Sequence, residues 1–446
     1  MKVLYKFFPV WFQHLIITIV NNYKYYLKYG AIPFYRPLKQ IISELDSKNL
    51  NDNNVLERIN QLLKYAVNNV DYYKQNKQKY KPLKSISEIK KLPVLKKSTL
   101  KKFNKKFISK ESTFFNTYRF KTSGSTGTPI RGSISKKDLK LRHKLILTSF
   151  KDQNIDYSLR LARFVGADIA DKKNIFRYDF INKHFLFSIY NLSQNNIIKY
   201  HKALKTNKIQ IIEGYPSTIY SLAKLLKESN LFLTDVKHVL TTAEKLLDYQ
   251  KIEIEKFFNV KIFDFYGSSE GSAYMFSKEN FYLNSNLIAY FEVVDENYKD
   301  AKYNDGQMLI TSFTSSFTPL IRYAIGDLCR LKSINDQIIK VDEIIGRQDD
   351  VYISPDGIEF SRFSLILKYL PEEVLESELC LYQGKNKAIL NYASDKPIEL
   401  KSFAVFESKL NQSLNMKFSI KYQRVKFFKK INRGKLSPVK IINEED

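Results

Sequence analysis

The sequence predicts an α/β protein in two parts, a large N-terminal domain with mixed sheets and helices and a small, mobile C-terminal α+β domain. Three observations support this prediction. The chain has 446 residues, which exceeds one ordinary hydrophobic core. Strand patterns alternate with helical patterns between about residues 114 and 265. After residues 346–350 the pattern changes to a separate set of short strands and helices. We therefore expect domains at 1–348 and 349–446, with 1–110 mainly helical.

The elements of the large domain follow from local signals. Ser135 can cap a helix, and Pro216 stands at the favoured first position of another helix. In order, we expect strands at 114–120 and 130–134, a helix to about 152, a helix opening at Pro216, a strand at 236–240, a helix at 246–258, a strand at 260–265 and mostly strands over 287–341. The C-terminal part is expected to have a helix at 360–370, strands at 376–382 and 387–392, a helix at 402–414 and a strand at 418–425.

Composition excludes several functional classes. Lys plus Arg is 73 and Asp plus Glu is 46, which gives a net charge of +27. The lysines are spread along the whole chain, so we expect no nucleic-acid partner, although such a field would attract polyanionic ligands such as ATP. Two cysteines and five scattered histidines argue against a disulfide framework and a zinc site.

Residues 7–20 form the longest apolar stretch near the N-terminus. The stretch is shorter than the roughly 20 residues that span a membrane and has no cleavage site after it. We favour a helix packed on the protein over contact with a membrane surface, and we expect a cytoplasmic protein.

Glycine is scarce, with only 14 residues. We therefore expect each glycine to stand where the backbone needs a conformation or a close approach that other residues do not allow. Most lie in a few short places, namely Gly124, Gly127 and Gly132; Gly267 and Gly271; Gly326; Gly346 and Gly357; and Gly434.

Four polar motifs coincide with these glycines. Residues 122–128 form a Ser/Thr/Gly loop that suits either a polyphosphate or a simple hairpin turn, and no Walker A lysine follows it. Residues 266–271 follow a strand directly, where ligands of α/β sheets bind. Asp327 follows Gly326 and suits either a ribose diol or a turn cap. Lys435 lies on a loop near the C-terminus, where a surface role is the alternative.

Taken in order, these motifs resemble the adenylate-forming superfamily of acyl-CoA ligases. The residues that carry the resemblance are the 122–128 loop, Tyr266-Gly267-Ser268-Ser269-Glu270, Arg322-Tyr323-Ala324-Ile325-Gly326-Asp327, Gly346-Arg347-Gln348-Asp349-Asp350 and Gly434-Lys435. Residues 92–97 and 213–217 further resemble the branch of phenylacetate-CoA ligase and CapK-like proteins. The resemblance covers nearly the whole chain.

The resemblance implies a role for each of these positions. Thr122, Ser123, Gly124, Ser125, Thr126, Gly127 and Thr128 would hold the β- and γ-phosphates of ATP. Glu244, Tyr266, Gly267 and Ser268 would complete the ATP site, with Tyr266 stacked on adenine and Ser269 near the α-phosphate. Glu270 would bind Mg²⁺, Asp327 and Arg347 would hold the ribose, Asp349 would be the hinge, and Lys435 would bridge the carboxylate and the α-phosphate.

The implied activity is ATP-dependent activation of a carboxylic acid through an acyl-adenylate. The acyl group would pass to coenzyme A, or to a sugar amine, an amino acid or a carrier thiol in CapK-like proteins, which are named for capsular polysaccharide loci. A non-catalytic homologue is the alternative of a different class. One departure concerns the acyl pocket, because the family's Gly-Gly-Glu reads Thr242-Ala243-Glu244 here.

Overall fold

The computed structural model describes most of the chain. The described residues are 5, 7–29, 55–121, 130–166, 169, 174–268, 270–279, 281–284, 288–301, 305–334, 339–347, 352–355, 359–360, 363–367, 369–371, 373–414, 416–425, 428 and 438–443.

Twelve of the described strands of the large part pair into one mixed sheet. Its order is β11 (Ala289–Val294), β12 (Asp305–Ser312), β13 (Tyr323–Ile334), β14 (Ile339–Arg347), β10 (Phe281–Asn284), β9 (Tyr274–Lys278), β8 (Ile262–Gly267), β7 (His238–Thr242), β6 (Ile211–Gly214), β3 (Leu161–Val165), β5 (His184–Ser188) and β4 (Phe176–Asp179). Strands β8, β7, β6, β3 and β5 are parallel, and β9 pairs with β8 in the antiparallel sense. The sheet therefore changes from parallel to antiparallel at β8.

Helices α8 (Ile197–Thr206), α9 (Pro216–Glu228) and α10 (Asp248–Phe258) connect parallel strands, and α7 (Lys136–Asp152) leads into β3. The sequence predicts α7, α9 and α10. Ser135 Oγ accepts a hydrogen bond from the backbone N–H of Asp138 at 2.9 Å, which confirms the predicted cap of α7. Pro216 is the first residue of α9, as predicted, and Ile219, Leu222, Leu225 and Leu226 of that helix are buried.

The N-terminal helices are α2 (Val10–Tyr29), α4 (Val55–Asn69), α5 (Asp71–Gln75) and α6 (Lys97–Lys102), and β1 (Thr117–Lys121) pairs with β2 (Arg131–Ser135). The predicted strand at 114–120 begins three residues late, because Phe114 and Phe115 lie in an exposed turn. Short 3-10 helices occupy Lys77–Lys79, Ile86–Lys91, Asn104–Phe107, Ile189–Asn191, Gln194–Asn196 and Leu400–Phe403.

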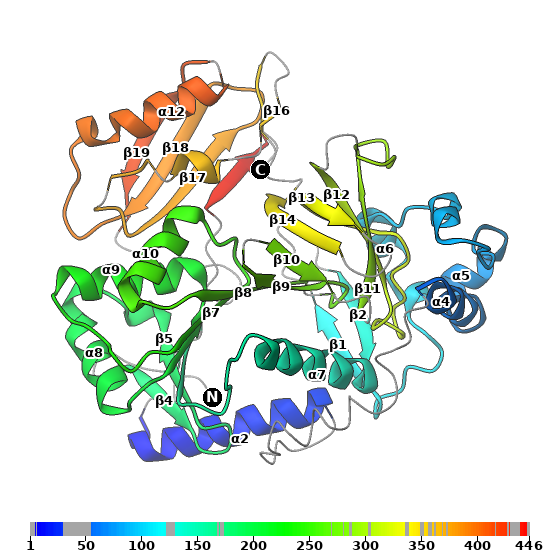
Figure 1. Ribbon diagram of the computed structural model, residues 1–446, viewed down its shortest axis with the longest axis horizontal. Helices are drawn as coiled ribbons and strands as arrows, with labels where there is room; N and C mark the ends of the chain where they lie inside the picture. The colour runs from blue at the N-terminus through cyan, green and yellow to red at the C-terminus, as the bar shows by residue number, and fades with distance from the viewer. Residues whose placement is uncertain are drawn as a thin grey trace.

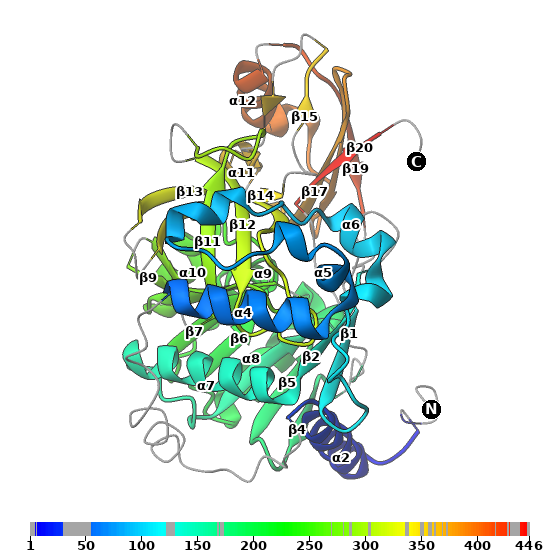
Figure 2. The same ribbon diagram turned by 90° about the vertical axis from the view of Figure 1, so that its right-hand side faces the viewer.

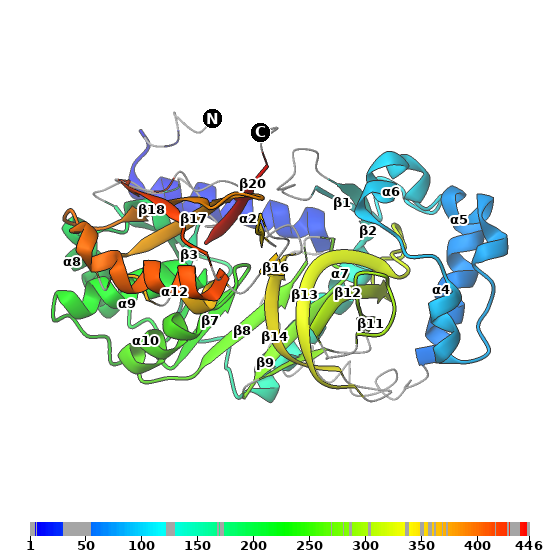
Figure 3. The same cartoon turned by 90° about the horizontal axis from the view of Figure 1, so that it is seen from above.

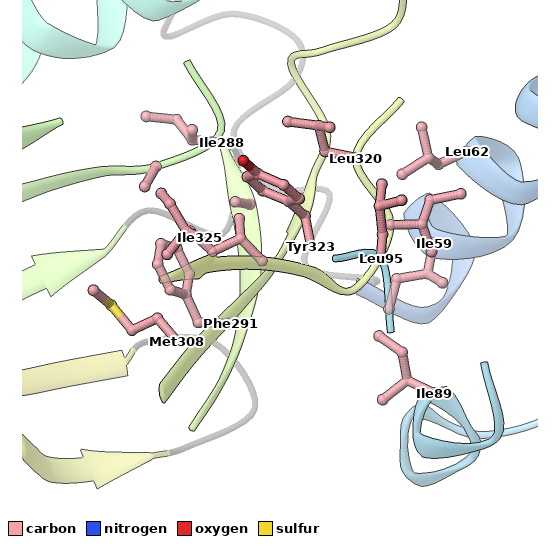
Figure 4. Close-up of a cluster of buried hydrophobic side chains, with 14 of the residues drawn as sticks. Ile59, Leu62, Ile89, Leu95, Ile288, Phe291, Met308, Leu320, Tyr323 and Ile325 are labelled. Carbon is pink, nitrogen blue, oxygen red and sulfur yellow. The ribbon is translucent and has the colours of Figure 1, made fainter. Parts of the chain in front are cut away.

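The main core joins the N-terminal helices to the antiparallel strands. Ile59 and Leu62 of α4 pack in the same buried cluster as Phe291 of β11 and Met308 of β12 (Figure 4). Tyr323 lies in this cluster with its side chain fully buried. The core therefore fixes the beginning of β13, which carries the predicted Asp327.

The C-terminal part has a sheet of its own, in the order β19 (Ser419–Arg424), β18 (Lys387–Ala393), β17 (Glu376–Tyr382) and β20 (Val439–Ile442). Helix α12 (Ala404–Leu414) covers one face of this sheet, which lies above the large part in Figure 1. Figure 3, seen from above, shows the C-terminal part over the half of the large part that carries α8, α9 and α10. The predicted helix at 360–370 is reduced to α11 (Ser364–Leu367), because Phe360 pairs with Tyr352 across β15 (Tyr352–Ile353) and β16 (Glu359–Phe360).

Helix α2 lies along the side of the molecule opposite the C-terminal sheet (Figures 1 and 2). It packs on the protein as predicted, but mainly through polar side chains: Gln13, Thr18 and Asn22 are buried together with Ile17, whereas Trp11 and Ile19 are exposed. Much of its apolar side-chain surface therefore faces away from the protein. In the described part of the chain, no helix has both the length and the hydrophobicity needed to cross a bilayer.

Candidate active site

The candidate site lies at the end of β8, where the sheet changes direction. Tyr266, near the end of this strand, donates its phenolic hydrogen to Oδ2 of Asp327 on β13. Asp327 in turn stands directly opposite Arg347 in the register of β13 and β14. The structure thus brings together three positions that the sequence assigns to the nucleoside, although the side chain of Arg347 is outside the described residues.

A tight turn follows β8 and closes on the hydroxyl of Ser268. Ser268 Oγ accepts hydrogen bonds from the backbone N–H groups of Ser272 at 3.0 Å and Ala273 at 3.3 Å. The N–H of Gly271 bonds to the carbonyl of Ser268 at 2.9 Å. In this structure the Ser268 hydroxyl therefore holds the turn. Ser269 lies outside the described residues.

Glu270 is carried by this turn and is buried, with 8% of its surface exposed. Its Oε1 accepts a hydrogen bond from Tyr323 Oη at 3.1 Å. Because the ring of Tyr323 is fixed in the main core, the carboxylate is held at a defined position (Figure 4).

A single carboxylate of this kind suits Mg²⁺, which usually takes one or two protein carboxylates and completes its shell with water and substrate phosphates. In the described residues no group of three or more His, Cys, Asp or Glu side chains could hold a metal by itself.

Gly271 shows why the turn needs glycine. Its φ is +65°, and a Cβ there would lie 1.6 Å from Nη1 of Arg142. Arg142 comes from α7 and is buried against the turn, with Nε bonded to Thr314 Oγ1 at 2.9 Å and Nη2 bonded to Ser315 Oγ at 3.0 Å. Burial lowers the pKa of Arg142, and the neighbouring Tyr274 opposes that shift. The sequence analysis missed Arg142, because its helical pattern resembles a surface cation.

Arg322 is a structural residue of the motif that ends at Asp327. It is 3% exposed and pairs with the buried carboxylate of Glu292 at 2.8 Å. Burial raises the pKa of Glu292, while Arg322 opposes that shift. The backbone of Arg322 also accepts a hydrogen bond from Leu95 N at 3.0 Å, so the 92–97 motif is paired directly with β13.

Lys97 is a second residue that the sequence analysis missed. A Cβ at Gly326 would lie 2.9 Å from Lys97 Nζ, so this cation stands beside the backbone of β13 directly before Asp327. The signal was available, since Lys97 ends the 92–97 motif that supports the resemblance.

Glu244 lies between β7 and α10. Its Oε2 accepts a hydrogen bond from the backbone N–H of Ser217 at 3.3 Å, at the N-terminus of α9, where a carboxylate is favoured. The preceding Ala243 has a φ of +71°, a conformation that favours glycine. The chain therefore keeps the backbone shape of a glycine at the position where Ala243 departs from the family pattern.

Burial also changes the titration of groups on β8. The pKa of Tyr266 is raised, first by burial and then by the charge of Asp327, so its hydroxyl stays a donor. Burial raises the pKa of Asp264 to about 6, although Thr241 and Tyr282 donate hydrogen bonds to it at 2.5 Å each.

Several predicted site residues lie outside the described residues. These are Thr122, Ser123, Gly124, Ser125, Thr126, Gly127, Thr128, Ser269, Asp349 and Lys435.

Comparison with known structures defines the class of the fold. No family model matches the sequence. A structure of 2-hydroxyisobutyryl-CoA ligase in the postadenylation state superposes with a TM-score of 0.67 and 16% identity, over 88% of this chain and 89% of that one. The same enzyme in the thioesterification state gives 0.52, with 92% and 91% covered. The protein therefore has the fold of the adenylate-forming acyl-CoA ligases, as the sequence predicts.

Within that class, the sequence is similar to protein CapK of Staphylococcus aureus. The two are 27% identical over 393 residues, which is 84% of each chain. Indoleacetate–lysine synthetase of Pseudomonas savastanoi is 33% identical over 151 residues, 33% of this chain and 36% of that protein.

Proposed function

We propose that the protein is a ligase that activates a carboxylic acid with ATP, forms an acyl-adenylate and transfers the acyl group to an acceptor. The observation that carries this proposal is the meeting of Tyr266, Asp327 and Glu270 at the switch of the sheet. In open α/β sheets, ligands bind beyond the carboxyl ends of the strands, and Tyr266 and Glu270 lie at the carboxyl end of β8.

On the nucleoside side, Tyr266 offers an aromatic face and holds Asp327 through its hydroxyl. The Asp327 carboxylate can accept hydrogen bonds from both ribose hydroxyls, with Arg347 opposite it on β14. Glu244 would contribute from the neighbouring strand end. Magnesium bound at Glu270 would neutralise phosphate charge as pyrophosphate leaves.

In the first step, a carboxylate oxygen of the acid attacks the α-phosphorus of ATP. A new bond forms between that oxygen and the α-phosphorus, and the bond to the β-phosphate oxygen breaks as pyrophosphate departs. The resemblance gives the phosphates to residues 122–128 and Ser269, and it gives the bridging cation to Lys435. The attacking group is already ionised, so the step needs no protein base.

We further propose that the C-terminal part turns about Asp349 between the two steps. The higher TM-score with the postadenylation state than with the thioesterification state supports an arrangement suited to the first step. In this arrangement Ser221 Oγ and Lys224 Nζ on α9 bond at 3.2 Å to the carbonyls of Leu375 and Val374. These contacts would break on rotation.

For the acceptor we favour coenzyme A, since the solved ligases of this fold are named for it. An amine is the second candidate, because indoleacetate–lysine synthetase is named for joining an acid to lysine. The similarity to CapK favours a sugar amine among amines and a place in surface polysaccharide biosynthesis.

Exchange of labelled pyrophosphate into ATP tests the first step. We expect exchange that depends on one member of a panel of aromatic acids, short acids and amino acids. The absence of exchange with every acid, from folded protein that binds ATP, would overturn the proposal in favour of a non-catalytic homologue. Coenzyme A, amino sugars, lysine and carrier thiols are then supplied separately to identify the acceptor.

A further inference from the structure

Helix α2 has an inverted polarity. Three of its four buried side chains, Gln13, Thr18 and Asn22, are polar and only Ile17 is apolar, whereas exposed apolar side chains repeat along the opposite side. The outward residues are Trp11, Leu15, Ile19, Tyr23 and Tyr26 on one face of the helix, together with Phe7 in the turn just before it. Trp11 is 66% exposed and Ile19 is 59% exposed. We call these six residues the outer face of α2.

The orientation of α2 is fixed by hydrogen bonds to the edge strand β4. His14 Nδ1 accepts from the backbone N–H of Tyr178, and Thr18 Oγ1 accepts from that of Phe180, each at 3.0 Å. Positions 14 and 18 are one helical turn apart, Tyr178 lies on β4, and Phe180 is the first residue after it. The side chains of α2 thus satisfy N–H groups of the terminal strand and of the turn that follows it.

Two further contacts hold the same side of the helix. Gln13 Oε1 accepts from Nε of the buried Arg177 at 2.7 Å, and Asn21 Nδ2 donates to Asp179 Oδ2 at 3.0 Å. Rotating α2 to hide its apolar side would break all of these bonds and leave Arg177 without Gln13. The exposed outer face is therefore imposed by specific contacts.

The surroundings of the outer face add apolar surface and positive charge. Phe180 and Ile181, in the turn that follows β4, are both exposed beside α2. Lys24 is exposed on the helix itself, and Lys183 is exposed next to that turn. In sequence, residues 1–43 contain no Asp or Glu, and their basic residues are Lys2, Lys6, Lys24, Lys28, Arg36 and Lys39.

We propose that α2 docks the protein on an anionic membrane surface, lying in the plane of the headgroups with its outer face in the lipid boundary. A helix with aromatic and aliphatic residues on one face and lysines beside it has the chemistry of such interfacial helices. Tryptophan and tyrosine favour this boundary, because one part of each ring is apolar and another is polar. A second copy of the chain fits less well, because pairing two outer faces would bring like charges together.

This inference goes beyond the proposed ligase activity and does not depend on it. The docked face lies opposite the C-terminal sheet, so that part would stay clear of the bilayer (Figure 1).

The chain supplies its own reporter, because Trp11 is its single tryptophan. The full-length protein is titrated with phosphatidylcholine vesicles and with vesicles of phosphatidylcholine and phosphatidylglycerol. We expect the emission of Trp11 to shift to the blue with the anionic vesicles only, and to be quenched by lipids brominated in the acyl chain. Raising the salt concentration should weaken the binding.

Variants distinguish vesicle binding through the outer face from non-specific adsorption through other exposed apolar residues. Ile19→Gln should weaken vesicle binding about tenfold, because one aliphatic side chain no longer enters the lipid. Lys24→Gln should weaken it about fivefold. Ile252→Gln on α10 is the matched control, since Ile252 is 62% exposed and should not affect binding. Circular dichroism checks that each variant is folded.

Three outcomes would overturn the proposal. The first is a Trp11 emission that is unchanged by anionic vesicles, and the second is binding that Ile19→Gln and Ile252→Gln weaken equally. The third is a blue shift that appears without lipid as protein concentration rises, together with a dimer in sedimentation velocity that Ile19→Gln dissociates. That third result would assign the outer face to a second copy of the chain.

Discussion

Tyr266 and Asp327 are joined by a hydrogen bond across the boundary between the parallel and antiparallel halves of the sheet. Tyr282 and Asp264 form the same kind of pair at 2.5 Å, with Asp264 on the same strand as Tyr266. Only the first pair stands among the residues that the resemblance gives to the nucleotide. The second pair is therefore an internal control for the first.

Tyr266→Phe keeps the aromatic ring and removes the hydroxyl that holds Asp327. We expect the KM for ATP to rise about tenfold, because a hydrogen bond to a charged group contributes roughly 1.5–3 kcal/mol. Tyr282→Phe should lower the free energy of unfolding and leave the KM for ATP unchanged. Pyrophosphate exchange and urea unfolding measure the two effects, and equal KM values for both variants would contradict the role of Tyr266.

Glu270→Gln should reduce adenylate formation about a hundredfold and weaken its dependence on Mg²⁺, while the protein stays folded. Glu292→Gln is the matched control, because Glu292 is equally buried but pairs with Arg322. That variant should lose about 3 kcal/mol of stability, since it breaks a buried ion pair. If Glu270→Gln unfolds the protein instead, Glu270 is structural.

Lys435→Ala should slow adenylate formation about a hundredfold or more and barely slow transfer from a supplied acyl-adenylate. The reason is that the proposed rotation removes Lys435 from the site before transfer. Lys440 on β20 forms an ion pair with Glu378 at 2.6 Å. The control variant Lys440→Ala should affect neither step. Single-turnover assays of each half-reaction decide, and an equal loss in both would refute the division of labour.

Stability should depend on pH through Asp264. Its folded pKa is raised from 3.8 to about 6 by burial, so the native state holds this proton more tightly than the unfolded chain. The stabilisation from the raised pKa of Asp264 amounts to about 3 kcal/mol of unfolding free energy. It is fully present below about pH 4 and is lost as the pH rises through 6. Asp264→Asn should flatten this slope in urea unfolding between pH 4 and 7, and Asp342→Asn, an exposed control, should not.

Ala243→Gly should raise the free energy of unfolding by about 0.5 kcal/mol with activity unchanged. The substitution relieves the strain of a φ of +71°, and the greater freedom of glycine in the unfolded chain offsets part of that gain. The control Ala203→Gly, in helix α8, should lower stability by about 1 kcal/mol. If thermal or urea unfolding shows that Ala243→Gly destabilises the protein, the inference that Ala243 is strained is wrong.

The sequence analysis predicted local features well. Strand β8 with its glycine turn, the cap of α7 and the start of α9 each depend on neighbouring residues, and each was found. Pairings between distant elements were not predictable. Nothing in the sequence around Arg322 indicates that it pairs with Glu292. Arg142 has the sequence pattern of an exposed helical cation, and only the structure shows that it packs against Gly271.

Helix α2 illustrates a further limit. The periodicity of its apolar residues defines a stripe, but it does not say whether the stripe faces the protein or the solvent. The hydrogen bonds of His14 and Thr18 determine which side of the helix faces the protein, and their partners, Tyr178 and Phe180, lie far away in sequence. Lys97 is the last residue of the 92–97 motif, but only the structure shows that its side chain lies beside Gly326.

The contacts of α2 with β4 also bear on how the protein should be handled. Deleting the N-terminal helix to gain solubility would uncover the N–H groups of Tyr178 and Phe180 on a sheet edge. An uncovered strand edge is a template for pairing with other chains, so such a truncation should precipitate more readily than the intact protein. Polar substitution of Leu15 and Ile19 leaves the edge covered, and it is therefore the better route to concentrated, crystallisable material.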